Sequence, residues 1–232
     1  MDASEVRRAR REELEYIHKT NLYTKVPRSK AKQLKAKVTT VRWIDINKGD
    51  QINENYRSCF AAIEIKTSNR PDLFAATPPL EAMKVILSIL TPGNKGEKLM
   101  VNDVSRSFFC AAARRQVFVE FPPEEPDCGT LVWELNYSMY GTRDAAQNWG
   151  EECAETMVQA GFVRGLASPC TFYHPGRNIM TYIHGDDYVS VATEENLVWL
   201  KGVLEKKYEI KTQVLGPGSK DEKQIKVLNR IL

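Results

Sequence analysis

The sequence predicts an α+β fold in which residues 98–232 form a ferredoxin-like split βαβ sheet. From Lys98 onward the expected elements run strand, helix, strand, strand, helix, strand, with one extra hairpin inserted early, and this is the order of that fold. Acidic residues fall at the end of the first strand and at the turn between the next two. The topology would bring them together at the centre of one sheet, so element order and side-chain chemistry agree.

A Gly-Asp-Asp sequence lies between two runs of β-type residues, 179–184 and 188–192. This pattern predicts a tight hairpin with Asp186 and Asp187 at its tip. Turn chemistry alone would account for an Asp or a Gly at such a place. Adjacent carboxylates repel each other, however, and a bound cation would relieve that repulsion.

A third carboxylate, Asp103, stands near the end of the apolar strand 98–104. An Asp that closes a buried strand is costly unless it is paired or bound to a metal, although it could also cap the next turn. Together with Asp186 and Asp187 it would form a set able to hold two divalent cations. Two metal ions roughly 3.5–4 Å apart are the usual device for in-line phosphoryl transfer.

The region before residue 98 is expected to be less regular. Residues 4–19 have the apolar spacing of a helix, and Pro27 with the basic residues after it is typical of a loop. Residues 38–46 and 56–65 have the β-branched content and alternation of paired strands. Thr77 and the two prolines after it predict the start of a helix that is apolar all round, and therefore deeply buried, and that ends at Gly93.

The second half supplies the remaining elements. Strands 116–121 and 130–135 form the inserted pair, and a long helix follows with apolar residues at helical spacing. Those residues are Ala145, Trp149, Cys153, Met157 and Ala160. Strand 170–173, a helix capped by Thr193, strand 209–215 and a last strand 225–232 complete the prediction.

Composition narrows the class of protein. The 232 residues suit one domain of two lobes or two small domains, and we expect an intracellular protein, cytoplasmic or nuclear, without a membrane partner. No apolar run is long enough to span a bilayer, and the first residues lack the apolar core of a signal peptide. The five cysteines are scattered without a CxxC pair, so neither a zinc site nor a disulfide framework is indicated.

Charge is unevenly distributed although the net charge is only +3. Between Lys25 and Lys48 eight residues are basic and one is acidic, a balance of +7, which leaves −4 for the remainder. A basic lobe beside an acidic one is typical of polyanion binding. A solvated lysine-rich loop is the alternative explanation.

Three motifs, in their order and spacing, make the chain resemble the reverse transcriptase domain of Ty1/copia-type retrotransposons, which is part of a Pol polyprotein. The family pattern D-V-x-x-A-F corresponds to residues 103–108, DVSRSF. The pattern S-L-Y-G-L-K-Q-A-P-R-x-W corresponds to residues 138–149, SMYGTRDAAQNW, and Y-V-D-D corresponds to residues 184–187, HGDD. The resemblance covers nearly the whole chain.

The resemblance implies a right-hand polymerase with fingers and palm. Residues 1–97 would be a basic, fingers-like region, and residues 98–232 the palm, with fingers insertions within 114–142. No thumb or RNase H segment is expected in this sequence, which looks like a piece of a Pol polyprotein. Other Pol domains would then be its partners, beside an RNA template, a DNA primer and dNTPs.

The resemblance also assigns roles to residues. Asp103, Asp186 and Asp187 would be the catalytic residues and the ligands of two Mg²⁺ ions, with Mn²⁺ as an alternative. The substrate-binding residues would be Val104, beside the metal or triphosphate; Phe108, which crowds the sugar 2′ position; Tyr140, Gly141 and Arg143, which line the nascent base pair and template; and Arg57. For Phe108, ordinary core packing is the alternative explanation. Lys211 is a weaker candidate, for the lysine that protonates the leaving pyrophosphate. The alternative for Lys211 is a solvated lysine at the surface.

Departures from the family pattern leave the activity of this copy open. The fingers strand usually has lysine, a residue and arginine, and here Cys59 stands where that arginine would clamp the triphosphate. A thiol cannot supply a bidentate charge. Ala146 replaces the family proline, and His184-Gly185 replaces the residues before the Asp pair.

RNA-directed DNA polymerisation is therefore the expected activity, with two alternatives. The first is a catalytically decayed remnant that only binds nucleic acid. The second is a viral RNA-dependent RNA polymerase, in which Gly-Asp-Asp also occurs. The Tyr140-Gly141 segment and the chain length argue against the second.

Overall fold

The computed structural model describes residues 1–50, 52–65, 73, 75–77, 79–90, 96–126, 128–227 and 230–232. The chain divides into two compact units, each made from two separate stretches of sequence. Unit 1 comprises Met1–Leu73 and Phe108–Trp149, and unit 2 comprises Phe74–Ser107 and Gly150–Leu232. Both units contain helices and strands, which confirms the predicted α+β class.

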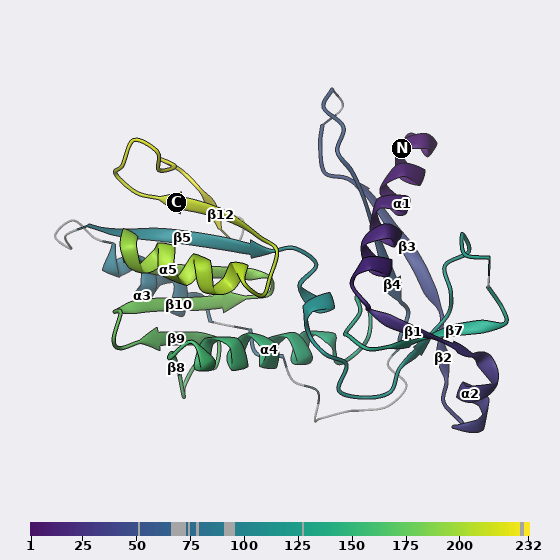
Figure 1. The fold of residues 1–232 in the computed structure, drawn as a ribbon. Helices are drawn as coiled ribbons and strands as arrows, with labels where there is room; N and C mark the ends of the chain where they lie inside the picture. The colour runs from purple at the N-terminus through teal and green to yellow at the C-terminus, as the bar shows by residue number, and fades with distance from the viewer. Residues whose placement is uncertain are drawn as a thin grey trace. The chain divides into compact units, whose positions relative to one another are not determined.

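Unit 1 contains two sheets within the described part of the chain (Figure 1). The strands of the first follow the order β1–β7–β6–β2, and β3 pairs with β4 in the second. The strands are β1 (Tyr23–Pro27), β2 (Val38–Thr39), β3 (Val41–Asn47), β4 (Tyr56–Ala62), β6 (Phe118–Val119) and β7 (Leu131–Leu135), and the helices are α1 (Ala3–Lys19) and α2 (Arg28–Gln33). Trp133 is fully buried in the main cluster of this unit, where its ring stacks on Tyr23 at 3.9 Å between centroids.

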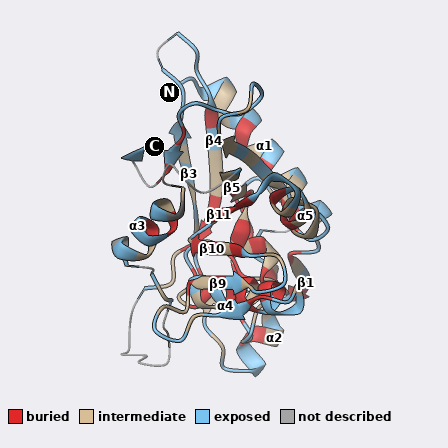
Figure 2. Ribbon diagram, turned by 90° about the vertical axis from the view of Figure 1, so that its left-hand side faces the viewer, coloured by how far each residue is buried: buried red, intermediate tan, exposed pale blue. Residues whose placement is uncertain are grey.

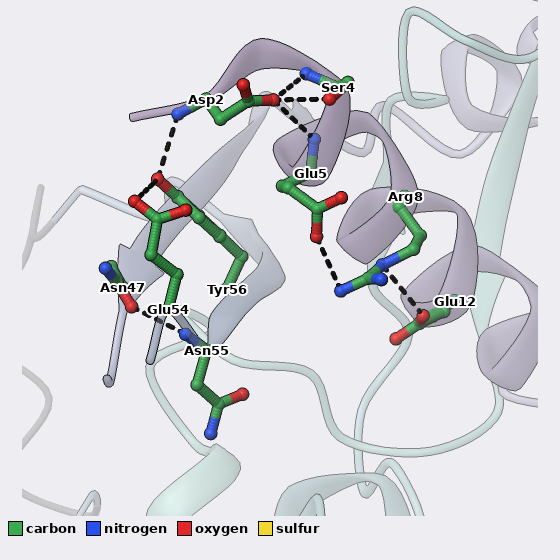
Figure 3. Close-up of polar contacts among 9 residues, drawn as sticks. All are labelled: Asp2, Ser4, Glu5, Arg8, Glu12, Asn47, Glu54, Asn55 and Tyr56. Atoms are coloured by element: carbon green, nitrogen blue, oxygen red, sulfur yellow. Dashed lines mark hydrogen bonds and ion pairs between the residues drawn. The ribbon is translucent and has the colours of Figure 1, made fainter. Parts of the chain in front are cut away.

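Helix α1 is fastened to the β3–β4 sheet by polar contacts. Asp2 caps the helix by accepting from the backbone N–H groups of Ser4 and Glu5, and its own N–H donates to the Tyr56 hydroxyl (Figure 3). Further along the helix, the Arg10 guanidinium donates to both carboxylate oxygens of Asp45, at 3.1 and 2.6 Å. Such capping and bidentate pairing fix a helix whose apolar stripe is thin.

Unit 2 is organised around a larger sheet, whose described strands follow the order β12–β5–β11–β10–β9–β8 (Figure 1). The strands are β5 (Glu97–Val104), β8 (Val163–Arg164), β9 (Thr171–His174), β10 (Ile179–His184), β11 (Asp187–Thr193) and β12 (Ile210–Leu215). The helices are α3 (Leu80–Ile89), α5 (Glu194–Glu205) and α4 (Ala145–Gln159), which contributes residues to both units. All ladders of this sheet are antiparallel.

Helices cover both faces of the unit 2 sheet. Met83 and Ile86 of α3 pack on Val101 and Val189, which point to one face. Figure 2 shows α5 on the opposite side of the sheet from α3, and Leu197, Leu200 and Leu204 of α5 are buried. The predicted stripe of α4 is confirmed, since Ala145, Trp149, Cys153 and Met157 are all buried. None of the helices among the described residues combines the length and the apolar character needed to cross a membrane.

Two local predictions in unit 1 were wrong. Pro27 ends strand β1 and precedes helix α2, where a loop was expected, because β1 finds its ladder partner more than a hundred residues away in β7. The single strand predicted at 38–46 is interrupted at Thr40. The residues before Thr40 pair with β6 in parallel, and those after it pair with β4. Both differences from the prediction arise from pairing with strands elsewhere in the chain, which a local sequence pattern cannot reveal.

Two predictions in unit 2 also need correction. Helix α3 follows Pro79 without a side-chain cap among the described residues, so Thr77 is not its N-cap, and Val85 is 56% exposed, so the helix is amphipathic. The predicted stop at Gly93 lies outside the described residues. The last strand is instead two short paired strands, β13 (Lys226–Val227) and β14 (Arg230–Ile231).

Candidate active site

Three carboxylates meet at one end of the unit 2 sheet. Asp103 lies near the end of β5, Asp187 begins β11, and Asp186 lies in the two-residue turn between β10 and β11. Gly185 opens this turn with φ +61°, a left-handed conformation that glycine adopts without strain. One carboxylate oxygen from each of the three Asp side chains lies within 4.8 Å of the other two. The structure therefore brings together the three acids that the sequence singled out.

The strand register aligns these acids with two further polar residues. Asp103 is directly opposite Asp187 on β11 and opposite Lys211 on β12, and Asp187 is opposite His184 on β10. Directly opposed residues of antiparallel strands place their side chains on the same face. His184, Asp187, Asp103 and Lys211 therefore form one row across four strands, with Lys211 exposed.

Hydrogen bonds hold the Asp-bearing turn against its neighbours. The Val104 N–H donates to the Asp186 carbonyl oxygen at 2.9 Å, and the Val104 side chain is buried. On the opposite face, the fully buried Asn102 accepts through Oδ1 from the Thr212 hydroxyl at 2.8 Å. A buried polar pair of this kind opposes a register slip, which would turn every side chain of the strand to the other face.

The electrostatics of the cluster favour a bound cation. Burial, and then the charges of Asp186 and Asp103, together raise the pKa of Asp187 to about 6, although His184 acts in the opposite direction. Like charges so close together cost free energy that a cation would remove. The donor set is made of hard carboxylate oxygens, which suit Mg²⁺ or Mn²⁺ better than softer metals.

Phe108 and Tyr140, two of the predicted substrate-binding residues, contact each other in unit 1. Their ring centroids are 4.9 Å apart. The Tyr140 carbonyl accepts from the Ala62 N–H at 2.8 Å, at the end of β4. Gly141 has φ +83°, and a Cβ atom there would lie 1.9 Å from the Ala62 carbonyl oxygen. This close approach explains why the turn needs glycine.

Arg57 and Cys59 lie on the same side of β4, two residues apart. Arg57 is exposed and opposite Ile46 on β3, whereas Cys59 is half-buried and opposite Ile44. Arg42 lies on this face as well, next to the isoleucines along β3. The face therefore presents two arginines and two exposed isoleucines around Cys59, where the family pattern led us to expect an arginine.

Part of the predicted positive lobe is balanced by acids of unit 1. Three of its eight basic residues form ion pairs: Lys25 with Glu125, Arg28 with Glu120 and Lys30 with Glu134. Lys32, Lys35 and Lys37 are exposed. The surface that could meet a polyanion is thus smaller than the sequence count indicated.

Sequence reasoning missed a charged cluster beside Arg143. Arg115 Nη2 donates to Glu64 Oε2 at 2.5 Å and to Asp144 Oδ1 at 2.8 Å. Glu64, Arg115 and Arg143 also line a pocket of about 270 Å³, together with Lys37. Arg115 is 51 positions from Glu64 and 29 positions from Asp144 in the chain. No local sequence pattern could therefore have revealed the cluster.

Comparison with known proteins gives one curated relative of note. No protein-family model matches the chain. The chain is 23% identical over 228 residues, 93% of its length, to the Retrovirus-related Pol polyprotein from transposon TNT 1-94 of Nicotiana tabacum. It spans 16% of the length of that relative.

A solved structure of low sequence identity shares the fold of this chain. Apo telomerase from Candida tropicalis superposes with a TM-score of 0.51 at 9% identity, over 94% of this chain and 57% of the other. A foamy viral protease–reverse transcriptase in complex with double-stranded DNA gives 0.47 at 11% identity, over 96% and 33%. At 9% identity, the telomerase superposition speaks only to the fold. The sequence match confirms the resemblance to Ty1/copia-type reverse transcriptase domains, and the chain is related to the Pol polyprotein of a retrotransposon.

Proposed function

We propose that this chain is the RNA-directed DNA polymerase domain of a copia-type retrotransposon. One observation carries the proposal: Asp103, Asp186 and Asp187 converge within 4.8 Å in a chain related along 93% of its length to a retrotransposon Pol polyprotein. The substrates would be an RNA template, a DNA primer and dNTPs, and other Pol domains would be partners.

The architecture supports an assignment of fingers and palm. In unit 2 the four strands ordered β12–β5–β11–β10 are connected through α4 and α5, and this order supports the proposal of a split βαβ, ferredoxin-like palm. Unit 1 combines residues 1–73 with 108–149. This supports fingers that combine the N-terminal region, proposed as 1–97, with insertions within 114–142 of a palm proposed as 98–232, although residues 74–97 group with unit 2.

The carboxylates would act as ligands of two divalent cations. Mg²⁺ at this site would lower the pKa of the primer 3′-hydroxyl and neutralise charge on the triphosphate. Asp103 and Asp187 are fixed by the β5–β11 register, and Asp186 by the hydrogen bond to Val104. Lys211, in the same row, would face the charge that develops on the leaving pyrophosphate.

Unit 1 would bind the incoming nucleotide and the template. Phe108, held against Tyr140, would crowd a sugar 2′-hydroxyl and so favour dNTPs. Arg143 and Gly141 would line the nascent base pair, and Arg57 would contact phosphate. Exposed lysines of the basic lobe would contact the template backbone without reading its sequence.

Primer extension tests the proposal directly. Wild-type protein and Asp186→Asn are compared on an RNA template with dNTPs and Mg²⁺, with Glu205→Gln, an exposed acid on α5, as the control for loss of one charge. We expect extension by the wild type and the control, and loss of at least 10²-fold in Asp186→Asn, since the residue would hold the metal. Extension by Asp186→Asn at the wild-type rate would exclude the assignment.

A decayed copy that only binds nucleic acid is the second candidate, favoured by Cys59. This thiol lies on the same face of the β3–β4 sheet as Arg42 and Arg57. Salt-dependent binding of a primer–template without extension at any Mg²⁺ or Mn²⁺ concentration would support it. If Cys59→Arg then restored extension, the missing guanidinium would be the cause.

A further inference from the structure

The turn formed by residues 140–143 is bound along the end of β4 by three hydrogen bonds. The Ala62 N–H donates to the Tyr140 carbonyl at 2.8 Å, and the Glu64 N–H donates to the Gly141 carbonyl at 3.4 Å. The Arg143 N–H donates in turn to the Glu64 side chain, Oε2, at 2.9 Å. The last of these bonds, and with it the position of the turn at Arg143, therefore depends on where the Glu64 carboxylate is held.

Arg115 holds that carboxylate. Its Nη2 donates to Glu64 Oε2 and to Asp144 Oδ1, which follows the turn directly. Asp144 also accepts, through Oδ2, from the Asn148 side chain at 3.2 Å, and Asn148 donates to the Ser138 hydroxyl at 2.9 Å. One connected hydrogen-bond network thus includes Ser138, which precedes the turn, and Asp144, which follows it.

The positive charge of Arg115 offsets the repulsion between the carboxylates of Glu64 and Asp144, which both accept from its Nη2. The side chains of Glu64 and Asp144 are 21% and 9% exposed, so water screens their repulsion poorly. Burial disfavours the charged guanidinium, but the hydrogen bonds to Asp144 and Glu64 outweigh it and raise the pKa of Arg115. Without the cation the two carboxylates would repel each other, and the Arg143 N–H would lose its fixed acceptor.

The turn in its bound position supports the aromatic pair of this unit. The Tyr140 ring lies 4.9 Å from Phe108 and 5.3 Å from Phe109, between ring centroids. A shift of the Tyr140 backbone would remove one wall against which Phe108 is held. Displacements of about 1 Å are enough to cost up to 10²-fold in a positioned reaction.

We infer that Arg115 is a positioning residue for sugar selectivity, acting through Glu64, Asp144 and the turn that carries Tyr140. The inference rests on the proposed function, because selectivity is defined only for a polymerase. Arg115 does not contact the nucleotide in this scheme.

The first experiment measures hydrogen exchange of the Arg143 backbone amide in the full chain. Arg115→Met removes the charge and keeps the side-chain length, and Arg115→Lys restores a charge with fewer donors. Arg10→Met is the matched control, since Arg10 is also 30% exposed and also bridges two acids of unit 1, away from the turn. We expect exchange at Arg143 to rise about tenfold or more in Arg115→Met, to recover partly in Arg115→Lys and to stay unchanged in Arg10→Met.

The second experiment measures the ratio of dNTP to rNTP incorporation, each as kcat/KM, in the same variants. We expect Arg115→Met to lower the ratio about tenfold or more, with Arg115→Lys between it and the wild type and Arg10→Met at the wild-type value. A lowered ratio that Arg115→Lys does not recover at all would contradict a role for the charge. If Arg115→Met does not fold, Glu64→Gln replaces it with the same expectation but a smaller effect, because this change keeps the shape of the side chain and removes the charge that accepts from both Arg115 and the Arg143 N–H.

The outcomes separate this inference from the proposed function. Unchanged exchange at Arg143 in Arg115→Met would overturn the positioning role, whatever the activity. Faster exchange with an unchanged dNTP-to-rNTP ratio would overturn the link to selectivity. If the wild type extends no primer, the proposed function and the selectivity claim are lost together, while the exchange data still decide whether Arg115 positions the turn.

Discussion

Replacing Asp187 with asparagine should stabilise the metal-free protein. Burial, then Asp186 and Asp103, raise the pKa of Asp187 from 3.8 to about 6. Between these values the unfolded chain releases the proton while the folded one retains it, so folding is increasingly disfavoured as the pH rises and the full cost applies above about pH 6. The difference corresponds to about 3 kcal/mol, and because the side chain is partly exposed, solvent screening reduces it to about 1–2 kcal/mol.

Urea unfolding in EDTA is the assay. At about pH 7.5 the free energy of unfolding of Asp187→Asn should exceed that of the wild type by about 1–2 kcal/mol, and at about pH 3.5 the two should coincide. Asp221→Asn is the control of opposite sign. Its hydrogen bond with Lys98 lowers the pKa of Asp221, so removing that charge should destabilise the protein at about pH 7.5.

Adding Mg²⁺ should reverse the order of stability. A ligand that binds only the folded state stabilises it by about 2.7 kcal/mol at a hundred times its Kd, and the variant lacks one of the three carboxylates. Equal or lower stability of Asp187→Asn in EDTA at about pH 7.5 would refute the electrostatic reasoning. A similar Mg²⁺ response in both proteins would refute the assignment of Asp187 as a ligand.

Two further variants test the packing of unit 1. Gly141→Ala should destabilise the protein by about 3 kcal/mol or more in urea unfolding, because it adds left-handed strain to a 1.9 Å overlap with the Ala62 carbonyl. The control, Gly150→Ala inside α4, meets nothing within 4 Å and should stabilise by about 0.5–1 kcal/mol. Arg10→Met should cost about 1–2 kcal/mol at neutral pH. Because Arg10 lowers the pKa of Asp45, this loss should shrink as the pH falls below about 4; a loss that persists there would point to packing alone.

The elements that the sequence predicted well are those whose signal is local. The hairpin of β10 and β11 follows from β-type residues around a Gly-Asp turn, and its register places Asp187 opposite His184. The stripe of α4 follows from helical spacing. The carboxylate cluster was predictable only because two such local signals, Asp103 and the hairpin, could be joined by a known order of elements.

The elements that could not be predicted depend on distant partners. Strand β1 pairs with β7, and Pro27 at its end resembles a loop signal until that partner is known. The parallel pairing of Val38 with Phe118 has no local signature at all. The network around Arg115 belongs to the same class, since its acids at Glu64 and Asp144 meet only in the folded chain.

The alternation of the two units along the chain constrains the way the protein emerges from the ribosome. Strand β5 is synthesised before residue 105, but its partners β11 and β12 follow only after residues 186 and 209. Strand β5, which carries Asp103, therefore has both edges unpaired until some eighty to a hundred further residues have been synthesised. Open strand edges invite wrong pairing. Slowed elongation over residues 105–187 should thus lower the yield of native protein more than the same delay placed after residue 215.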